Sequence, residues 1–175
     1  VDGNWLHYTH QNGEAPLRRA VVDWLAPRDL GPITEQDLLL CLGGQHGINL
    51  TLACCLRGDR PVVLIEDLAY PGFRYAARAA RADVVTVELD HEGIRPWGGL
   101  PALRARAPDR VWYTGSFSKS VSAALRFGYV VCPAGMGENA RLAAQHNFFA
   151  LSLPLSELVL RLLQSGAADD IRVKV

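Results

Sequence analysis

The sequence lacks three features that mark large classes of protein. Neither sign of charge is in excess, since Lys+Arg and Asp+Glu number 18 each, so the charge balance would recruit neither nucleic acid nor an anionic membrane. No run approaches the roughly 18 uninterrupted apolar residues of a membrane span. The first residues, VDGNWLHYTH, show no basic-then-apolar signal pattern. With 49% hydrophobic residues over 175 positions, we expect one soluble domain with a real core.

The cysteines lack the pattern of a disulfide framework or of a metal site. Cys41, Cys54, Cys55 and Cys132 each lie in an apolar run, and no CxxC-like pair has histidines at ligand spacing. Disulfide frameworks are typical of small, loop-rich secreted chains. We therefore expect buried free thiols, no metal site and a reducing, cytoplasmic location.

Hydrophobic periodicity predicts an alternation of strands and helices. Residues 15–25 (APLRRAVVDWL) have helical spacing and a proline suited to the first turn. Because strand and helix patterns alternate over the next 65 residues, the sequence favours an α/β fold with a mostly parallel sheet and flanking helices. Helices are further predicted at 47–56, 71–82 and within 136–163, and strands at 37–42, 61–67, 83–90, 110–115 and 126–133.

The segment LCLGGQHGINL joins a predicted strand to a predicted helix through glycines. A G-x-G-x-x-G dinucleotide fingerprint ending on Gly47 would need its first glycine at Leu42, where the tight turn is made, so it fails. A Walker A loop fails because no Gly-Lys-Ser/Thr follows. Two interpretations stay open for Gly43 to His46: a phosphate held by backbone N–H groups at a helix N-terminus, or a tight turn without a ligand.

The stretch GSFSKSVSAALR, between two predicted strands, carries the most informative chemistry. Lys119 would ordinarily be a surface lysine. Here Arg126 follows seven residues later, and Ser116 and Ser118 stand beside the lysine. An amine forms an imine only after losing its proton, which burial and nearby positive charge favour. Hydroxyls and a guanidinium suit a phosphate dianion, so this segment could hold both ends of a phosphorylated aldehyde.

Lys119 and its surroundings resemble the cofactor-lysine motif of class I/II aminotransferases, the fold-type I enzymes that use pyridoxal 5'-phosphate (PLP). The resemblance is closest to the aminotransferase-like domain of MocR-type, GntR-family transcriptional regulators. Three further stretches agree with it in the right order. The first, HYTHQNGEAPLRRAVVDWL, is similar to the family's Tyr-x-x-x-x-Gly-x-x-x-Leu-Arg segment. The second, LCLGGQHGINLTL, is similar to its phosphate-loop turn. The third, VVLIEDLAYPGFR, is similar to its Glu-Asp-Pro-x-Tyr-Pro-Gly segment.

The resemblance implies a role for each matching residue. Lys119 would form the Schiff base with PLP, and Ser116 and Arg126 would bind the phosphate. Three loop residues would meet the same phosphate, mainly through backbone N–H groups: Gly44, Gln45 and His46.

Two tyrosines complete the implied site. Tyr70 would stack on the pyridine ring, although it could also be an ordinary turn aromatic before Pro71. Tyr8 would reach the phosphate in the neighbouring subunit, which implies a homodimer with shared sites, although it could also be a surface residue.

The resemblance runs from about Tyr8 to Phe149 but is interrupted in HEGIRPWGGLPALRARAPD. Family members carry there an Asn-Pro-x-Gly motif, an aspartate that pairs with the pyridinium nitrogen and a tyrosine that bonds the cofactor's phenolic oxygen. None of these occurs between Gly93 and Arg110. We therefore expect residues 1–175 to be one incomplete aminotransferase-like PLP-binding domain, the large domain of fold type I. An internal segment near 94–100 and the C-terminal small domain would be missing.

Three functions are compatible with these features. The first is PLP-dependent amino-group transfer from an amino acid or amine, with Lys119 forming the Schiff base and then moving the α-proton. The second is a PLP-binding sensor domain of a MocR-type regulator, although no basic recognition helix is present in this domain. The third is an inert remnant. A GntR-like N-terminal extension in the full-length protein would favour the regulator, and its absence the enzyme.

Overall fold

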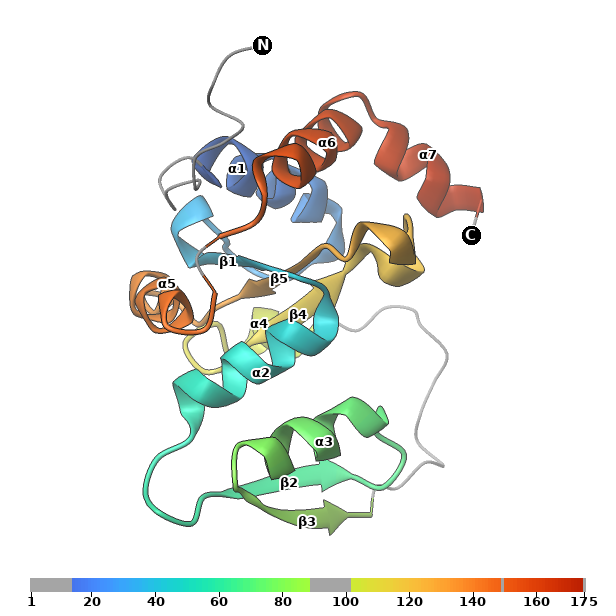
Figure 1. Ribbon diagram of the computed structural model, residues 1–175. Helices are drawn as coiled ribbons and strands as arrows, with labels where there is room; N and C mark the ends of the chain where they lie inside the picture. The colour runs from blue at the N-terminus through green and yellow to red at the C-terminus, as the bar shows by residue number, and fades with distance from the viewer. Residues whose placement is uncertain (1–13, 89–101, 149, 175) are drawn as a thin grey trace.

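The computed structural model describes residues 14–88, 102–148 and 150–174 as an α/β fold (Figure 1). Within these ranges five strands form two sheets, a three-stranded sheet of order β1-β5-β4 and a two-stranded sheet of β2 and β3. The strands are β1 (Leu38–Cys41), β2 (Val62–Glu66), β3 (Asp83–Val87), β4 (Tyr113–Ser116) and β5 (Gly128–Val131). The helices are α1 (Ala15–Leu25), α2 (Gly44–Cys55), α3 (Pro71–Ala79), α4 (Leu103–Arg106), α5 (Gly137–Gln145), α6 (Leu153–Gln164) and α7 (Ala167–Lys174), with short 3-10 helices at Ala26–Arg28, Glu35–Asp37, Phe117–Lys119 and Ala123–Leu125.

The predicted α/β class with flanking helices is confirmed, and the pairing of the described strands is mixed. Strands β2 and β3 pair in parallel, whereas β5 is antiparallel to both β1 and β4. Strands β1 and β4 therefore run in the same direction, with β5 reversed between them. The sequence pattern marks β5 as a buried strand but carries no information on which neighbours it pairs with, because that depends on contacts far apart in the chain.

The three-stranded sheet lies between two layers of helices (Figure 1). On one face, Leu38 and Leu40 of β1 pack with residues of α1 and α6, and on the other, Leu39 and Cys41 pack with α2 and α5. Burial on both faces explains why β1 and β5 are continuous apolar runs rather than alternating ones.

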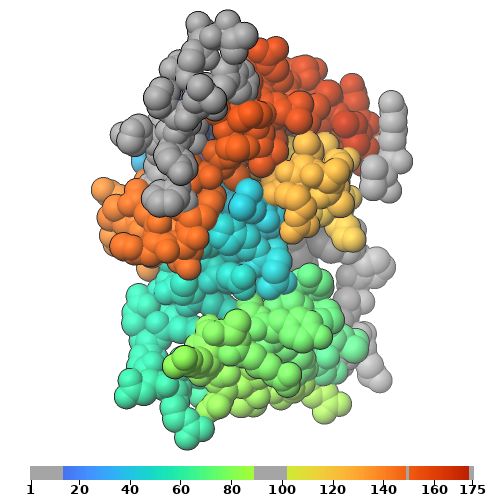
Figure 2. Space-filling view, viewed as in Figure 1, coloured from blue at the N-terminus to red at the C-terminus, as the bar shows by residue number. Residues whose placement is uncertain are grey.

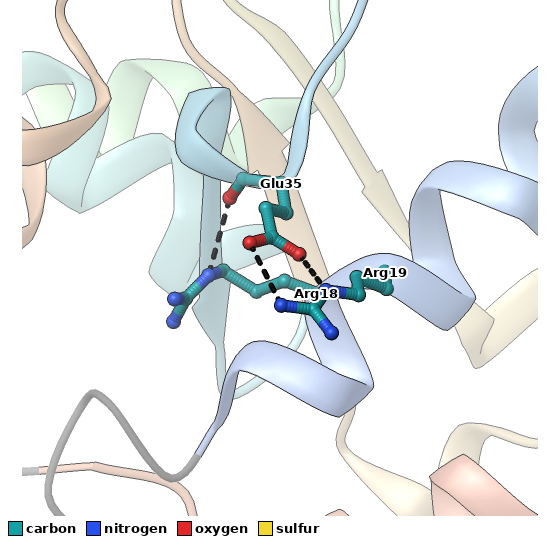
Figure 3. A network of polar contacts seen from close by, with 3 residues as sticks. All are labelled: Arg18, Arg19 and Glu35. Carbon is teal, nitrogen blue, oxygen red and sulfur yellow. Dashed lines mark hydrogen bonds and ion pairs between the residues drawn. The ribbon is translucent and has the colours of Figure 1, made fainter.

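The periodicity of the first helix is confirmed by its packing. Leu17, Val21, Trp24 and Leu25 are all buried in the larger core, and Pro16 occupies the first turn. Polar contacts tie the same helix to the chain before β1. Arg18 Nε donates to the carbonyl of Glu35 at 3.1 Å, and Arg19 pairs with the Glu35 carboxylate (Figure 3).

The cysteines are free thiols, as predicted, but one of them is not buried. Cys41, Cys54 and Cys132 lie in the core, whereas Cys55 is exposed at the C-terminal end of α2. The correction follows from helical geometry, because two adjacent residues of a helix point about 100° apart and only Cys54 faces the sheet. Every helix in the described part of the chain is too short or too polar to traverse a lipid bilayer.

Candidate functional site

Strand direction brings three distant segments of the chain to one edge of the sheet. In the β1–β5 ladder Cys41 is opposite Gly128, and in the β4–β5 ladder Ser116 is opposite the same glycine. The carboxyl ends of β1 and β4 therefore lie on either side of the first residue of β5. The β1–α2 turn, the segment that contains Lys119, and Arg126 consequently meet at this edge.

The β1–α2 turn depends on glycine for its backbone conformation and its close packing. Gly43 is the N-cap of α2 and has a φ of 85°, a region that L side chains rarely adopt. Strand β5 passes so close that a Cβ on Gly128 would lie 2.6 Å from the carbonyl carbon of Gly43. The intrahelical bonds of α2 begin with the Gly47 N–H, which donates to Gly43 O at 3.1 Å. The N–H groups of the preceding first-turn residues have no intrahelical acceptor, which is what an anion at a helix N-terminus needs.

Ser116 and Lys119 are presented by the end of β4 and the 3-10 turn that follows. Phe117, between them, is fully buried and packs against Phe127 with ring centroids 4.8 Å apart, which anchors the turn. Ser116 faces the β1–α2 turn, since a Cβ on Gly44 would lie 3.7 Å from Ser116 Oγ. Lys119 is exposed, so the described residues do not bury its ammonium group.

Arg126 lies over the same glycine turn. Its backbone has a φ of 47°, which ends the 3-10 helix Ala123–Leu125 and starts the approach to β5. A Cβ on Gly43 would lie 3.4 Å from Arg126 Nη2, so the guanidinium is next to the N-terminus of α2. Among the described residues, neither Lys119 nor Arg126 has an ion-pair partner.

Gln45 and His46 have side chains that are already engaged. Gln45 Nε2 donates to the carbonyl of Gly72 at 3.1 Å. His46 Nδ1 accepts from the Leu42 N–H at 3.1 Å, and its ring packs edge-on against Phe148 at 4.7 Å. Burial lowers the pKa of the His46 imidazole, which favours this neutral, accepting form. The backbone N–H of His46 remains the group that could meet an anion.

Residues of these segments line a common cavity of about 450 Å³. This volume is within the usual range for small-molecule sites. Figure 2 shows α3, in green, packed below α2, in teal, and the cavity is lined from both helices and from the β4 end. Among the lining residues, all of which the structure describes, the charged ones are Lys119 and Arg126, so the cavity suits an anion. The lining is Gly44, Gln45, Ile48, Tyr70, Phe73, Thr114, Gly115, Ser116, Ser118, Lys119, Ala123 and Arg126.

Six of the residues singled out from the sequence line this cavity: Gly44, Gln45, Tyr70, Ser116, Lys119 and Arg126. His46 is in the first turn of α2 but outside the lining, and Tyr8 lies outside the described residues. Among the lining residues that the sequence interpretation missed are Ile48 and Thr114. Spacing could have identified both, because Ile48 follows Gly44 by one helical turn and Thr114 shares a strand face with Ser116. No group of metal-ligating side chains occurs in the ranges that the structure describes.

The family model for class I and II aminotransferases matches residues 2–97, more than half of the chain. The chain belongs to this family.

Some aminotransferases are similar to the chain in sequence, and others are similar to it in fold. The aspartate aminotransferase of Pyrococcus horikoshii is 31% identical over 93 residues, which are 53% of this chain and 23% of that protein. An archaeal alanine:glyoxylate aminotransferase has a similar fold, with a TM-score of 0.84, 15% identity and coverage of 99% of this chain and 59% of that chain. The kynurenine aminotransferase of P. horikoshii, solved in complex with PMP, has a TM-score of 0.81, 17% identity and coverage of 98% of this chain and 58% of that chain.

These likenesses confirm fold type I as the architecture. They also show that the chain spans less than two thirds of the length of these aminotransferases. The family match ends at residue 97, within the stretch where the sequence departs from the family pattern.

Proposed function

We propose that this chain is a PLP-binding aminotransferase domain, in which Lys119 binds the cofactor covalently and the intact protein transfers an amino group from an amino acid or amine. One observation carries the proposal: Lys119, Arg126, Ser116 and the N-terminus of α2 line a single cavity of about 450 Å³. Membership of the aminotransferase family supports the same cofactor.

The donors present fit the phosphate of PLP. Ser116 supplies a hydroxyl, Arg126 a guanidinium fork, and the first turn of α2 supplies N–H groups and the positive end of the helix dipole. The N–H groups are those of Gly44, Gln45 and His46. Because both cations lack a carboxylate partner in the described part of the chain, a phosphate dianion would neutralise charge that is otherwise uncompensated.

The remaining residues suit the other end of the cofactor. Tyr70 lines the cavity from the start of α3 and offers its ring as a stacking face. When bound, PLP supplies a conjugated ring that can take up the electron pair released at the α-carbon of an amino acid. Lys119, once displaced by the incoming amine, holds and returns the proton at that carbon.

The proposed transfer is tested by the conversion of PLP into its amine form, PMP. The chain would be loaded with PLP, supplied in turn with a panel of amino acids, and assayed for PMP by chromatography. Wild-type protein is expected to form PMP with at least one amino acid, and Lys119→Ala is expected to form none above the rate in free solution. Equal PMP formation by the two proteins would remove Lys119 from the reaction.

We further propose that the chain lacks an internal segment between about residues 94 and 100, in a stretch that lies outside the described residues. The small sheet supports this. Val62, Leu64, Val85 and Val87 are 56%, 66%, 47% and 37% exposed on the face of β2–β3 that α3 does not cover. Parallel strands are normally covered on both faces, and an isolated pair of strands is marginal in water.

The absent segment would carry the Asn-Pro motif, the aspartate for the pyridinium nitrogen and the tyrosine for the phenolic oxygen. Without that aspartate the ring is a weak electron acceptor, so PMP formation by the present chain should be slow. The test is the sequence of the full gene. An insertion at this point that restores fast PMP formation supports the proposal. A continuous Arg95-Pro96-Trp97-Gly98 peptide in the native protein would contradict it and favour an inert remnant.

Two finer hypotheses accompany the proposal. A MocR-type sensor requires a GntR-like winged-helix domain upstream in the same gene, so the full coding sequence separates sensor from enzyme. A homodimer in which Tyr8 reaches the partner's phosphate predicts that Tyr8→Phe weakens PLP binding in the dimer, and sedimentation of the loaded protein measures the assembly.

A further inference from the structure

Gln45 connects α2 and α3, two helices that both contribute residues to the lining of the cavity. It is the second residue of α2, and its Nε2 donates to the carbonyl of Gly72, the second residue of α3, at 3.1 Å. One side-chain hydrogen bond thus joins the first turn of α2, which faces the proposed phosphate, to the first turn of α3. Helices α2 and α3 also lie against each other in the space-filling view (Figure 2).

The same contact includes the ring of Tyr70. A Cβ on Gly72 would lie 2.0 Å from Gln45 Oε1 and 2.1 Å from Tyr70 Cε1, so the amide and the ring both press on the glycine. Gly72 is buried, whereas Tyr70 is 60% exposed. An aromatic ring that is mostly in solvent keeps one orientation only if its neighbours restrict it, because ordering a side chain costs rotamer entropy. Gly72 is one such neighbour of the Tyr70 ring, and the Gln45 amide lies against the same glycine.

We propose that Gln45 is a positioning residue that couples the anion site at the N-terminus of α2 to the ring of Tyr70. The inference rests on the proposed function, because the ring that Tyr70 would cover is that of PLP. The backbone N–H of Gln45 belongs to the anion site, while its side-chain amide holds the turn that carries Tyr70. Phosphate binding would therefore order the first turn of α2 and, through the Gln45–Gly72 hydrogen bond, the stacking ring. Gly72 would have to remain glycine for the same reason.

Gln45→Met separates the two functions, because it keeps the backbone N–H and the length of the side chain but removes the amide donor. If Gln45 acts through Tyr70, the variant loses the stacking contribution. The PLP dissociation constant should then rise about 2- to 12-fold, the equivalent of about 0.5–1.5 kcal/mol. The circular dichroism of bound PLP, which reports how the ring is held, should weaken as well. Gln145→Met, at the exposed end of α5, is the matched control.

A double-mutant cycle tests whether the effect passes through Tyr70. Gln45→Met in a Tyr70→Ala background should cost less than about twofold in affinity, since the ring it positions is gone. Equal losses in the two backgrounds would overturn the coupling, because Gln45 would then act independently of the ring. An unchanged dichroic signal in Gln45→Met would overturn it too.

Hydrogen–deuterium exchange without cofactor keeps this inference distinct from the cofactor assignment. In wild-type protein, the backbone amides of residues 72–75 at the start of α3 should exchange more slowly than in Gln45→Met, and inorganic phosphate should slow them further only in the wild type. No difference between the two proteins would sink the inference even if PLP binds. The expected difference in a wild-type protein that fails to bind PLP would support the coupling and overturn the proposed function instead.

Discussion

Removing the guanidinium of Arg126 should weaken cofactor binding more than any other single side-chain truncation on the phosphate side of the cavity. The Nη2 atom lies next to the Gly43 turn, where a phosphate at the N-terminus of α2 would sit, and no described carboxylate competes for it. Arg126 is exposed, so its removal creates no cavity in the core. The effect should therefore appear in binding and not in folding.

The expected magnitude follows from the type of contact. A hydrogen bond from a charged group contributes about 1.5–3 kcal/mol, so Arg126→Ala should raise the PLP dissociation constant roughly 10- to 150-fold. Screening by solvent and salt at this exposed position favours the lower half of that range. The PLP dissociation constant of Arg126→Lys should lie between those of the wild type and Arg126→Ala, because lysine keeps the charge but loses the planar fork.

The assay is a PLP titration followed by absorbance, repeated with inorganic phosphate as competitor. Arg161→Ala is the matched control, because this exposed arginine of α6 pairs with Glu157 and lies outside the cavity. Because inorganic phosphate would use the same guanidinium contact, the inhibition constant of phosphate should rise in Arg126→Ala as well. Wild-type affinity in Arg126→Ala, with an unchanged melting temperature, would refute the phosphate role.

Two further predictions concern stability. The Glu14 carboxyl is buried, and its Oε1 accepts from the Leu151 N–H at 3.2 Å. Burial raises the pKa of this carboxyl, so its contribution to the free energy of unfolding is present at low pH and is lost as the pH rises through the folded-state pKa. Urea unfolding between about pH 4 and 7 should therefore show the unfolding free energy of Glu14→Gln increasing relative to that of the wild type as the pH rises. A relative decrease with rising pH would contradict this. Gly115→Ala should cost about 1–3 kcal/mol of unfolding free energy, because a Cβ there would lie 2.4 Å from the Tyr129 ring. Gly44→Ala is the control, because a Cβ there would lie 3.7 Å from its nearest neighbour, the Ser116 side chain. Equal stability of the two variants would rule out the steric argument.

Local signals in the sequence predicted the five strands and the helices α1, α2 and α3, whereas the helical stretch 136–163 contains two helices, α5 and α6, and neither α4 nor α7 was predicted. Helix α1 begins and ends at the predicted residues, since Pro16 and the apolar positions leave one consistent helical frame. Strand β5 was predicted as a strand, yet its place between β1 and β4 was not. Tyr129 and Val131 join one core and Val130 the other, so both faces of β5 are apolar and the pattern does not say which strands lie beside it.

The same distinction applies to the site. Gly44, Ser116, Lys119 and Arg126 could be proposed as site residues because each stands in a local pattern with a chemical meaning. Their shared cavity depends on Gly128 being opposite both Cys41 and Ser116, which is a matter of register and not of local sequence. The side chain of Gln45 bonds Gly72, 27 residues away, and that contact has no local signal at all.

The covalent assignment of Lys119 can be tested directly because the chain contains only two lysines, Lys119 and Lys174. The PLP-loaded protein would be reduced with borohydride, digested, and mapped by mass spectrometry for phosphopyridoxyl-lysine. The label should appear on Lys119 in the wild type, persist in Lys174→Arg and disappear in Lys119→Arg. A label on Lys174 or on the N-terminal amine, or no stable label at all, would contradict the central claim.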